Sequence, residues 1–243
     1  MTTHTILLAG GKGTRLLSKK AKALQTLAGK SFLEHILSSA EAISDKVSIV
    51  VGFDKHAVEK EAAKILKKAK IFVQEDQIGT ADAVKPVIDF IDENEKVLIL
   101  YGDVPLIKEK TLKKLFSLND SLSILTTNVS DPTGYGRVLK DSNGLVEEII
   151  EEKDSNTEQK SIKEIFTGVM VVNGKILKEL IPFISNNNAS KEYYLTDLIG
   201  IANSNGFKIE TLSVSCEETL GANTRIEQEL SLIHISEPTR HHV

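Results

Sequence analysis

Short apolar runs alternate with amphipathic segments through the first part of this chain. Apolar runs of about four to eight residues between turn residues are typical of buried strands, whereas apolar positions at helical spacing are typical of helices that bury one face. The patterns predict strands over 6–9, 47–51, 71–74 and 96–101, and helices over 31–40, 57–69 and 81–91. Such alternation predicts an α/β fold around a doubly wound, mostly parallel (mixed) sheet.

The pattern becomes richer in strands and turns in the second part of the chain. The predicted strands are 122–129, 137–139, 144–146, 168–172 and 208–213, of which the second and third form a hairpin. A turn-rich segment over 131–137 precedes the hairpin, and a polar stretch over 186–197 is expected to open a helix. We expect the β-rich insertion to form a lid over a second substrate.

Composition and charge narrow the function. The chain has 243 residues and a formal net charge of -4, which argues against nucleic-acid binding because recognition of a phosphate backbone normally requires a strongly basic surface. With a single cysteine, Cys216, there is no internal disulfide and no cysteine-built zinc site, as is typical of a reducing cytoplasm. No apolar run approaches the roughly 18 residues of a membrane span, and no signal segment precedes the first strand. We expect a cytoplasmic protein without a nucleic-acid or membrane partner.

The final residues are not expected to belong to the folded domain. The string Leu-Ser-Leu-Ile-His-Ile-Ser-Glu-Pro-Thr-Arg over 230–240 resembles the translation of a sequencing adapter. We therefore predict one domain over 1–228 and a non-native tail over 229–243. Outside the tail only His4, His35 and His56 remain, so no histidine cluster for catalysis or metal binding is expected.

The stretch 5–15 is the strongest candidate for a ligand site. Three glycines within 10–13 follow the first predicted strand, and glycine allows a tight turn with no side chain in front of a ligand. Such a turn can aim consecutive N–H groups at a phosphate chain, beside the positive charges of Lys12 and Arg15. A P-loop string is absent, and Leu16 stands where a dinucleotide fingerprint needs its third glycine. The turn therefore predicts another kind of nucleoside triphosphate site.

A carboxylate follows another predicted strand. Asp103 comes after the strand 96–101, and ligands of doubly wound sheets bind beyond the carboxyl ends of the strands. A triphosphate usually travels with Mg²⁺, which prefers carboxylates and waters. An aspartate after a strand is often only a turn or cap residue, but its position beside the glycine turn makes Asp103 the first candidate metal ligand.

Seven short motifs occur in an order that resembles one family. They are Leu-Ala-Gly-Gly-Lys-Gly-Thr-Arg at 8–15 with Lys22, Gln74 ahead of Gly79-Thr80, Tyr-Gly-Asp-Val-Pro-Leu at 101–106, Asp-Pro-Thr-Gly-Tyr-Gly-Arg at 131–137, Glu151 with Lys153-Asp154, Asn-Asn-Asn-Ala at 186–189 with Glu-Tyr-Tyr-Leu-Thr-Asp at 192–197, and Gly-Ala-Asn-Thr-Arg at 221–225. Together they resemble the N-terminal uridylyltransferase domain of the N-acetylglucosamine-1-phosphate uridylyltransferases, which are nucleotide-sugar nucleotidyltransferases. The likeness covers 5–226.

The resemblance implies a Rossmann-like nucleotidyltransferase fold with a β-rich sugar-binding insertion, and a role for each matching residue. The residues that it implies for UTP binding are Leu8, Ala9, Gly10, Gly11, Gln74, Gly79 and Thr80. It makes Arg15, Lys22 and Asp103 catalytic, and it makes Asp103 and Asn223 the ligands of Mg²⁺. The remaining substrate-binding residues are Tyr101, Gly102, Gly136, Glu151, Phe166, Tyr194 and Thr196, of which the last five belong to the sugar pocket.

The implied reaction is transfer of a uridylyl group. N-acetylglucosamine 1-phosphate would attack the α-phosphorus of UTP in line, pyrophosphate would leave, and UDP-N-acetylglucosamine would form. Positioning of the two anions and neutralisation of their charge would supply most of the acceleration, with Mg²⁺ as template and Lewis acid. The same chemistry on another sugar 1-phosphate is one alternative, and a non-catalytic nucleotide-sugar-binding regulator is another. Intact Arg15, Lys22, Asp103 and Asn223 argue against the regulator.

The chain departs from the family pattern at two positions. Phe166 stands where the family usually has an asparagine in the sugar pocket, and loss of a buried hydrogen-bond partner costs roughly 1–3 kcal/mol, enough to alter sugar preference. Ala21 replaces a common proline, which predicts a less rigid loop. The family often adds a β-helix of hexapeptide repeats that forms trimers. No such repeats occur in this sequence, so a homo-oligomer is expected only if the natural chain continues into that domain.

Overall fold

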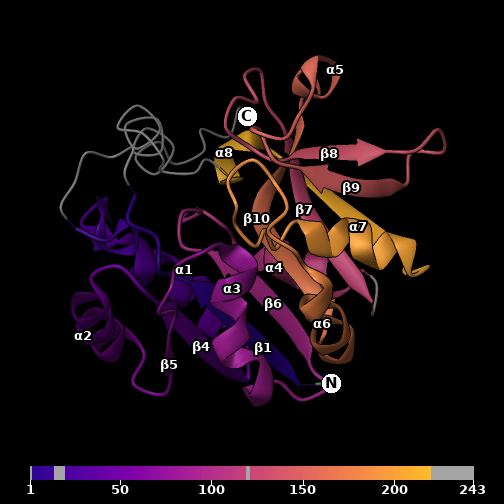
Figure 1. Cartoon of the computed structure of the whole chain (residues 1–243). Helices are drawn as coiled ribbons and strands as arrows, with labels where there is room; N and C mark the ends of the chain where they lie inside the picture. The colour runs from indigo at the N-terminus through magenta and orange to yellow at the C-terminus, as the bar shows by residue number, and fades with distance from the viewer. Residues whose placement is uncertain (1, 14–19, 119–120, 220–243) are drawn as a thin grey trace, which may run out of the picture.

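The structure is a computed structural model that describes residues 2–13, 20–118 and 121–219 (Figure 1). Within these ranges lies a nine-stranded sheet. Its strands are β1 (Thr3–Leu8), β4 (Lys46–Val51), β5 (Lys70–Val73), β6 (Lys96–Tyr101), β7 (Leu122–Asn128), β8 (Arg137–Lys140), β9 (Val146–Ile150), β10 (Glu164–Asn173) and β11 (Ile209–Val214). Two short strands, β2 (Thr26–Leu27) and β3 (Lys30–Ser31), form a separate small sheet.

The first half of the chain forms the parallel part of the large sheet. β1 pairs with β4 on one side and with β6 on the other, and β4 pairs with β5. The chain thus moves outward from β1 through β4 to β5 and then returns to the opposite side of β1 as β6. This reversal makes the boundary between β1 and β6 the topological switch point, where doubly wound sheets bind their ligands.

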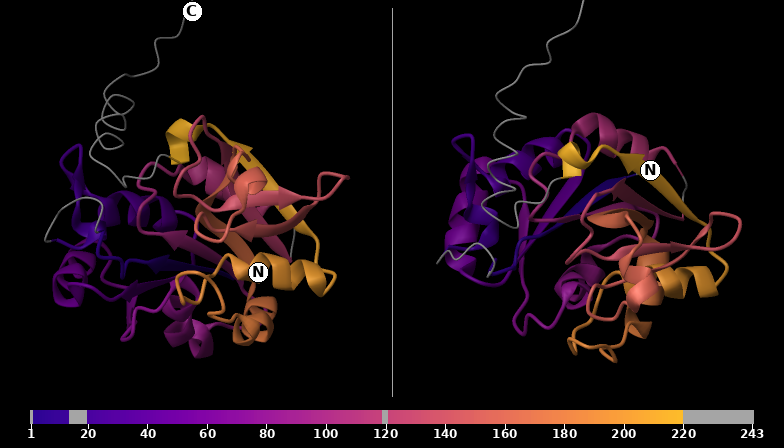
Figure 2. Two further views of the ribbon diagram at one scale, coloured as in Figure 1. Left: turned by 45° about the horizontal axis from the view of Figure 1, so that its top comes forward. Right: turned by 90° about the horizontal axis from the view of Figure 1, so that it is seen from above.

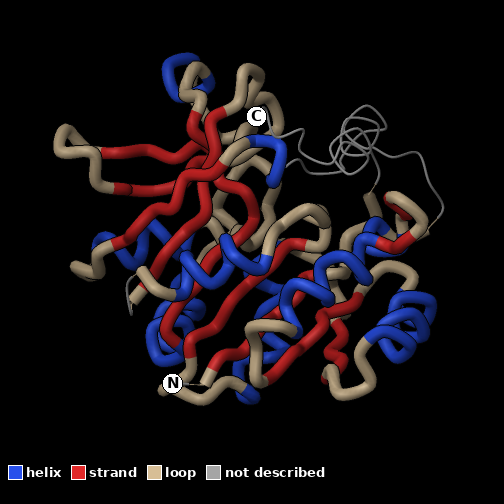
Figure 3. The backbone as a smooth tube through the Cα atoms, turned by 180° about the vertical axis from the view of Figure 1, so that it is seen from behind, coloured by secondary structure: helices blue, strands red, loops and turns tan. Residues whose placement is uncertain are grey.

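The second half of the chain gives the sheet its mixed character. β10 lies antiparallel between β6 and β7, and β11 runs parallel to β7 at the edge. The predicted hairpin is the antiparallel pair β8 and β9, which joins β10 where Arg137 faces Ile165. Figures 1 and 3 show this hairpin standing away from the parallel strands. The predicted α/β class is therefore confirmed, with a β-rich insertion on one side of the sheet.

Helices cover both faces of the sheet, as the two views of Figure 2 show. They are η2 (Lys22–Leu24), α1 (Phe32–Glu41), α2 (Lys55–Ile65), α3 (Thr80–Val84), η3 (Lys85–Phe90), α4 (Glu109–Phe116), α5 (Thr157–Lys160), α6 (Gly174–Leu180), η4 (Ile181–Phe183), α7 (Asp197–Ser204) and α8 (Cys216–Thr219). Successive strand residues point to opposite faces. Ile6 and Ile99 share one core cluster with residues of α3, η3, α6 and α7, whereas Leu7 and Leu98 share the other with residues of α1, α2 and α4. The sheet is therefore doubly wound.

Several predicted boundaries were wrong. The helix expected over 81–91 is split, because Pro86 near the start of η3 has no N–H to donate and α3 gives way to a 3-10 helix. The helix expected over 57–69 ends at Ile65. Residues 186–196 are largely irregular, and α7 begins only at Asp197. The helices α4, α5 and α6 were not predicted, and α5 and α6 have only 4 and 7 residues on which to show a period.

Some expectations concern residues outside the described ranges. Arg15, Asn223 and the tail at 229–243 belong to this set, so their predicted roles stay predictions. Among the helices of the described ranges, none has the length and apolar character needed to cross a bilayer.

Candidate active site

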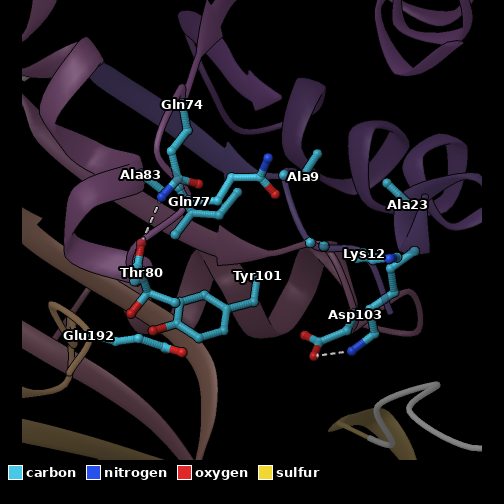
Figure 4. Close-up of a pocket in the computed structure, with 16 residues that line it drawn as sticks. Ala9, Lys12, Ala23, Gln74, Gln77, Thr80, Ala83, Tyr101, Asp103 and Glu192 are labelled. Atoms are coloured by element: carbon cyan, nitrogen blue, oxygen red, sulfur yellow. Dashed lines mark hydrogen bonds and ion pairs between the residues drawn. The ribbon is translucent and has the colours of Figure 1, made fainter. Parts of the chain in front are cut away.

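A cavity of about 320 Å³ opens at the switch point of the sheet (Figure 4). The ends of β1 and β6, the helices η2 and α3, and the segments after β5 and before α7 line this cavity. The lining residues are Leu8, Ala9, Gly10, Gly11, Lys12, Lys22, Ala23, Gln74, Gln77, Gly79, Thr80, Ala83, Tyr101, Gly102, Asp103 and Glu192. All seven residues expected to bind UTP lie in this set. We name this space the first cavity.

The glycine turn after β1 wraps around Lys22. The amide of Lys22 donates to the carbonyl of Gly11 at 3.2 Å. Gly13 has a φ of 66°, and a Cβ there would lie 3.0 Å from Cβ of Lys22. Any residue with a side chain would therefore be strained at position 13 and would press on the lysine. The turn thus holds the backbone of Lys22 in the lining of the first cavity.

Lys22 and Asp103 form an ion pair across the first cavity. The Nζ atom of Lys22 donates to Oδ2 of Asp103 at 2.7 Å, and the dashed line at Asp103 in Figure 4 marks this interaction. The side chains are 17% and 25% exposed, so the pair is partly shielded from water. The first residue of η2 and a residue just after β6, 81 positions apart in sequence, therefore meet at the switch point.

Gln74 is oriented by its own hydrogen bonds. Its Nε2 donates to the carbonyl of Gly79 at 2.9 Å and to Oδ2 of Asp82 at 3.0 Å. Because both partners accept, the amide nitrogen must point toward them, and Oε1 remains the acceptor on the other side. A Cβ added to Gly10 would lie 3.2 Å from this oxygen, so Oε1 faces the glycine turn. Gln74 therefore offers a hydrogen-bond acceptor inside the first cavity.

The turn before α3 is locked to the loop before α7. Gly79 has a φ of 130°, and a Cβ there would lie 2.3 Å from the carbonyl oxygen of Tyr193. Tyr193 donates to the carbonyl of Ile78 at 2.8 Å and accepts from the amide of Ala81 at 2.9 Å. This close backbone approach requires glycine. It also brings Glu192 to the rim of the first cavity.

A second cavity of about 210 Å³ adjoins the first. It is lined by Tyr101, Asp103, Val104, Gly134, Tyr135, Gly136, Glu151, Phe166, Thr167, Gly168 and Thr219. Tyr101 and Asp103 line both spaces. The β-rich insertion supplies Gly136 and Glu151, and β10 supplies Phe166. One carboxylate therefore stands between two cavities that different halves of the chain build.

Glu151 is a buried carboxylate of the second cavity. Thr196 donates its hydroxyl to Oε1 of Glu151 at 2.9 Å. Burial raises the pKa of Glu151, and the nearby charges of Asp154 and Glu192 add to that effect against the hydrogen bond from Thr196. Asp197 lies in the same acidic surroundings, and its pKa is raised to about 6 by burial and by Glu151. This region of the site therefore disfavours negative charge.

Tyr101 connects the two cavities. Its ring packs edge-on against Phe166 with the centroids 6.0 Å apart, and its hydroxyl hydrogen-bonds Thr80. The hydroxyl of Thr80 in turn accepts from the amide of Leu195 at 2.8 Å. Burial raises the pKa of Tyr101 far above its ordinary value, so the hydroxyl stays protonated. Tyr101 thus ties the first turn of α3 to the wall of the second cavity.

The predicted site residues divide into three groups. Every predicted substrate-binding residue except Tyr194 and Thr196 lines one of the two cavities, as do Lys22 and Asp103. Thr196 lines neither cavity but hydrogen-bonds the carboxylate of Glu151. The half-buried Tyr194 also lines neither cavity. Arg15 and Asn223 lie outside the described residues. Lys12, which the sequence placed beside the phosphate-binding turn, also lines the first cavity. The lining residues to which the sequence assigned no role are Ala23, Gln77, Ala83, Glu192, Val104, Gly134, Tyr135, Thr167, Gly168 and Thr219.

The donor set fits a hard divalent cation held mainly by substrate. Across the described ranges no group of three or more His, Cys, Asp or Glu side chains gathers as a metal cage. Asp103 nevertheless presents a carboxylate where both cavities meet. Mg²⁺ is usually bound through one or two carboxylates together with substrate phosphates and waters. Asp103 could therefore hold such an ion when a triphosphate is bound.

A glycine turn, a lysine and a carboxylate at the switch point of a doubly wound sheet are typical of nucleotide-binding proteins. The chain belongs to the nucleotidyl transferase family, whose model matches residues 4–209. It is 44% identical over 227 residues to Bifunctional protein GlmU of Saccharophagus degradans, and 39% identical over 232 residues to the protein of the same name from Clostridioides difficile. These relatives confirm the resemblance that the seven motifs indicated.

The chain spans about half the length of the curated relatives it matches. The alignments cover 92% and 93% of this chain but 50% of each relative. A solved structure of a Bacillus anthracis protein, assigned as a glucose-1-phosphate thymidylyltransferase and bound to sucrose, superposes with a TM-score of 0.78. That match covers 99% of this chain and 98% of the other at 17% identity, so it supports the fold alone.

Proposed function

We propose that this chain transfers a uridylyl group from UTP to N-acetylglucosamine 1-phosphate, forming UDP-N-acetylglucosamine and pyrophosphate. The observation that carries the proposal is the position of Asp103, which lines both cavities beside Lys22. An in-line transfer needs two anionic substrates to meet at one point, where their mutual repulsion is neutralised. Membership in the nucleotidyl transferase family and similarity to the GlmU proteins support this chemistry.

The first cavity suits the nucleotide. The backbone of the glycine turn and the side chain of Lys22 offer N–H donors and positive charge to the phosphates. The acceptor Oε1 of Gln74 can pair with the ring N–H that uracil carries and that cytosine lacks at the equivalent position. Gln74 would thereby favour UTP over CTP.

The second cavity suits the sugar 1-phosphate. Glu151 offers its carboxylate as an acceptor for sugar hydroxyls, and its own position is fixed by Thr196. Backbone groups of Gly134 and Gly136 line the same wall. The phosphate end of the sugar would lie toward Asp103, the residue common to both cavities.

The negative charge of the two substrates would be neutralised where the two cavities meet. Asp103 would hold Mg²⁺ with the substrate phosphates, and the metal would supply charge neutralisation and a template for both anions. Lys22 would bind the phosphates of the nucleotide. The prediction that Arg15 and Asn223 join this set stays part of the proposal. The chain itself offers positioning and electrostatic stabilisation rather than a covalent intermediate.

Phe166 favours a second candidate, the same transfer to another sugar 1-phosphate. Its ring is 5% exposed and forms an apolar wall of the second cavity against Tyr101. A hydroxyl that faces this ring loses a hydrogen bond, which costs roughly 1–3 kcal/mol. Sugars without a hydroxyl at that position would then compete with N-acetylglucosamine 1-phosphate.

The test is pyrophosphate release with a panel of nucleoside triphosphates and sugar 1-phosphates, with and without Mg²⁺. The proposal predicts release that needs Mg²⁺, UTP and N-acetylglucosamine 1-phosphate together. Release with a different sugar 1-phosphate at higher kcat/KM would support the second candidate. Tight binding of nucleotide sugar without pyrophosphate release from any pair would instead identify a non-catalytic regulator and overturn the proposal.

A further inference from the structure

The ion pair between Lys22 and Asp103 puts an ammonium group on the carboxylate that is proposed to hold the metal. The Nζ to Oδ2 distance is 2.7 Å, and both side chains are at least three-quarters buried. A partly buried charge pair is screened less by salt and water than a pair on the surface. A divalent cation that approaches Asp103 must therefore compete with a positive charge already bound there.

Both members of the pair are held by backbone. The amide of Lys22 donates a hydrogen bond to the carbonyl of Gly11, and Gly13 packs closely against the Lys22 side chain. Asp103 follows Gly102, whose amide donates to the carbonyl of Leu8 at 3.0 Å. Lys22, the first residue of η2, is thus held against the turn that follows β1, and Asp103 is held just after β6. Both residues line the first cavity.

A triphosphate changes the balance of charge at this point. Without it, a divalent cation on Asp103 would face the ammonium of Lys22 across a short distance, which is unfavourable. A triphosphate brings several negative charges and can accept hydrogen bonds from the ammonium while it also ligates the cation. Lys22 then gains a new partner, and Asp103 becomes available to the metal.

We propose that Lys22 acts as an internal counter-ion that keeps a bare divalent cation off Asp103, so that the metal binds this carboxylate only together with the nucleoside triphosphate. The inference rests on the proposed function in one respect, namely that Asp103 is a metal ligand. It adds a second task to Lys22 beyond contact with phosphate.

Lys12 provides a matched control. It lines the same cavity and carries the same charge, but its Nζ lies over the ring of Phe53 at 5.3 Å from the centroid. Lys12→Met therefore removes one positive charge from the cavity without touching the pair. Lys22→Met removes the counter-ion itself and keeps most of the side-chain volume.

The experiment measures Mn²⁺ binding to the full chain by electron paramagnetic resonance of free Mn²⁺, with and without UTP. Without UTP, Lys22→Met is expected to bind Mn²⁺ at least about fivefold more tightly than the unmodified protein, since a charge pair of this kind is worth about 1 kcal/mol. Lys12→Met is expected to change the affinity by less than about twofold. Adding Asp103→Asn to Lys22→Met should abolish the gain. Lys22→Gln serves as a second variant should Lys22→Met fail to give a cooperative melt.

The outcomes separate the inference from the proposed function. Equal Mn²⁺ affinity of the unmodified protein and of both Lys22 variants without UTP, combined with Asp103-dependent binding when UTP is present, would overturn the counter-ion role alone. A gain of the same size in Lys12→Met would also overturn it, because the effect would then be one of general cavity charge. Binding that ignores Asp103→Asn even with UTP would remove Asp103 as a metal ligand, and with it that part of the proposed function.

Discussion

The two cavities share Asp103 but are built in different ways. The first is lined by residues at the ends of parallel strands and by residues of η2 and α3, all within the first 103 residues apart from Glu192. The second combines the end of β6 with residues of the insertion, β10 and α8. Strand ends are positioned by the sheet itself, whereas the insertion depends on long-range antiparallel pairing with β10. The sheet therefore fixes the geometry of the first cavity, whereas the second cavity can change with the insertion.

The largest expected effect comes from the residue that belongs to both cavities. Asp103→Ala should lower kcat by at least about a hundredfold, because the charge of two anionic substrates is then poorly neutralised. The melting temperature should fall by less than about 4 °C, since a partly exposed ion pair contributes little to stability. Asp89→Ala, which removes an exposed carboxylate of η3, is the control for a loss of charge. Near-normal turnover in a stable Asp103→Ala protein would contradict the assignment.

A substitution confined to the second cavity should affect the KM of one substrate and leave the KM of the other nearly unchanged. Glu151→Ala removes the proposed acceptor of sugar hydroxyls, so KM for the sugar 1-phosphate should rise about tenfold. KM for UTP should change by less than about twofold, because the first cavity keeps its lining. Steady-state kinetics with each substrate varied in turn measures both values. Glu147→Ala alters an exposed glutamate of β9 and should leave both constants unchanged. Equal increases in both KM values would mean that the cavities do not work separately.

A smaller effect is expected from the aromatic wall. Phe166→Asn should change the ratio of kcat/KM between two sugar 1-phosphates by about tenfold, in favour of the sugar with a hydroxyl facing that position. A ratio measured in one protein does not depend on how much of that protein is folded. Phe183→Asn, at a ring that is 71% exposed on η4, is the matched control and should leave the ratio unchanged. An unchanged ratio in Phe166→Asn would exclude this wall from sugar recognition.

The smallest expected effect concerns stability and pH. Burial raises the pKa of Asp197 to about 6, so the folded protein holds this proton more tightly than the unfolded chain does. The contribution of Asp197 to the free energy of unfolding is therefore complete below the ordinary aspartate pKa, and it is lost as pH rises through about 6. Asp197→Asn should flatten this decline and gain up to about 1 kcal/mol at pH 7, after allowance for solvent screening. Thermal melts of both proteins between about pH 4 and pH 8 test this; a parallel decline in the variant would contradict it.

The parallel half could be predicted from the sequence to a large extent. The apolar runs that become β1, β4 and β6 are short, continuous and bounded by turn residues, which is typical of strands buried on both faces. Parallel strands bring their carboxyl ends to one edge, so Gly10 and Asp103 could be expected to meet. In a parallel sheet, the pattern that predicts a strand therefore also predicts where the residue after that strand lies.

The residues that sequence reasoning missed are positioned by contacts that leave no periodic signal. Glu192 reaches the first cavity because Tyr193 hydrogen-bonds the turn at Ile78, more than 100 residues earlier in the chain. Gln77 lines the same cavity from a left-handed φ of 47°, which a residue other than glycine rarely adopts. The place of β10, antiparallel between β6 and β7, likewise depends on pairings that are distant in sequence. Motif order could find Glu151 and Thr196, but only the structure places Thr196 behind the carboxylate.

A crystal structure of the protein with bound UDP-N-acetylglucosamine would show which part of the product each cavity holds. Uracil is expected against Gln74 in the first cavity, the sugar beside Glu151 in the second, and the diphosphate between them next to Asp103. A product molecule whose sugar lies outside the second cavity, or whose phosphates lie away from Asp103, would contradict this expectation.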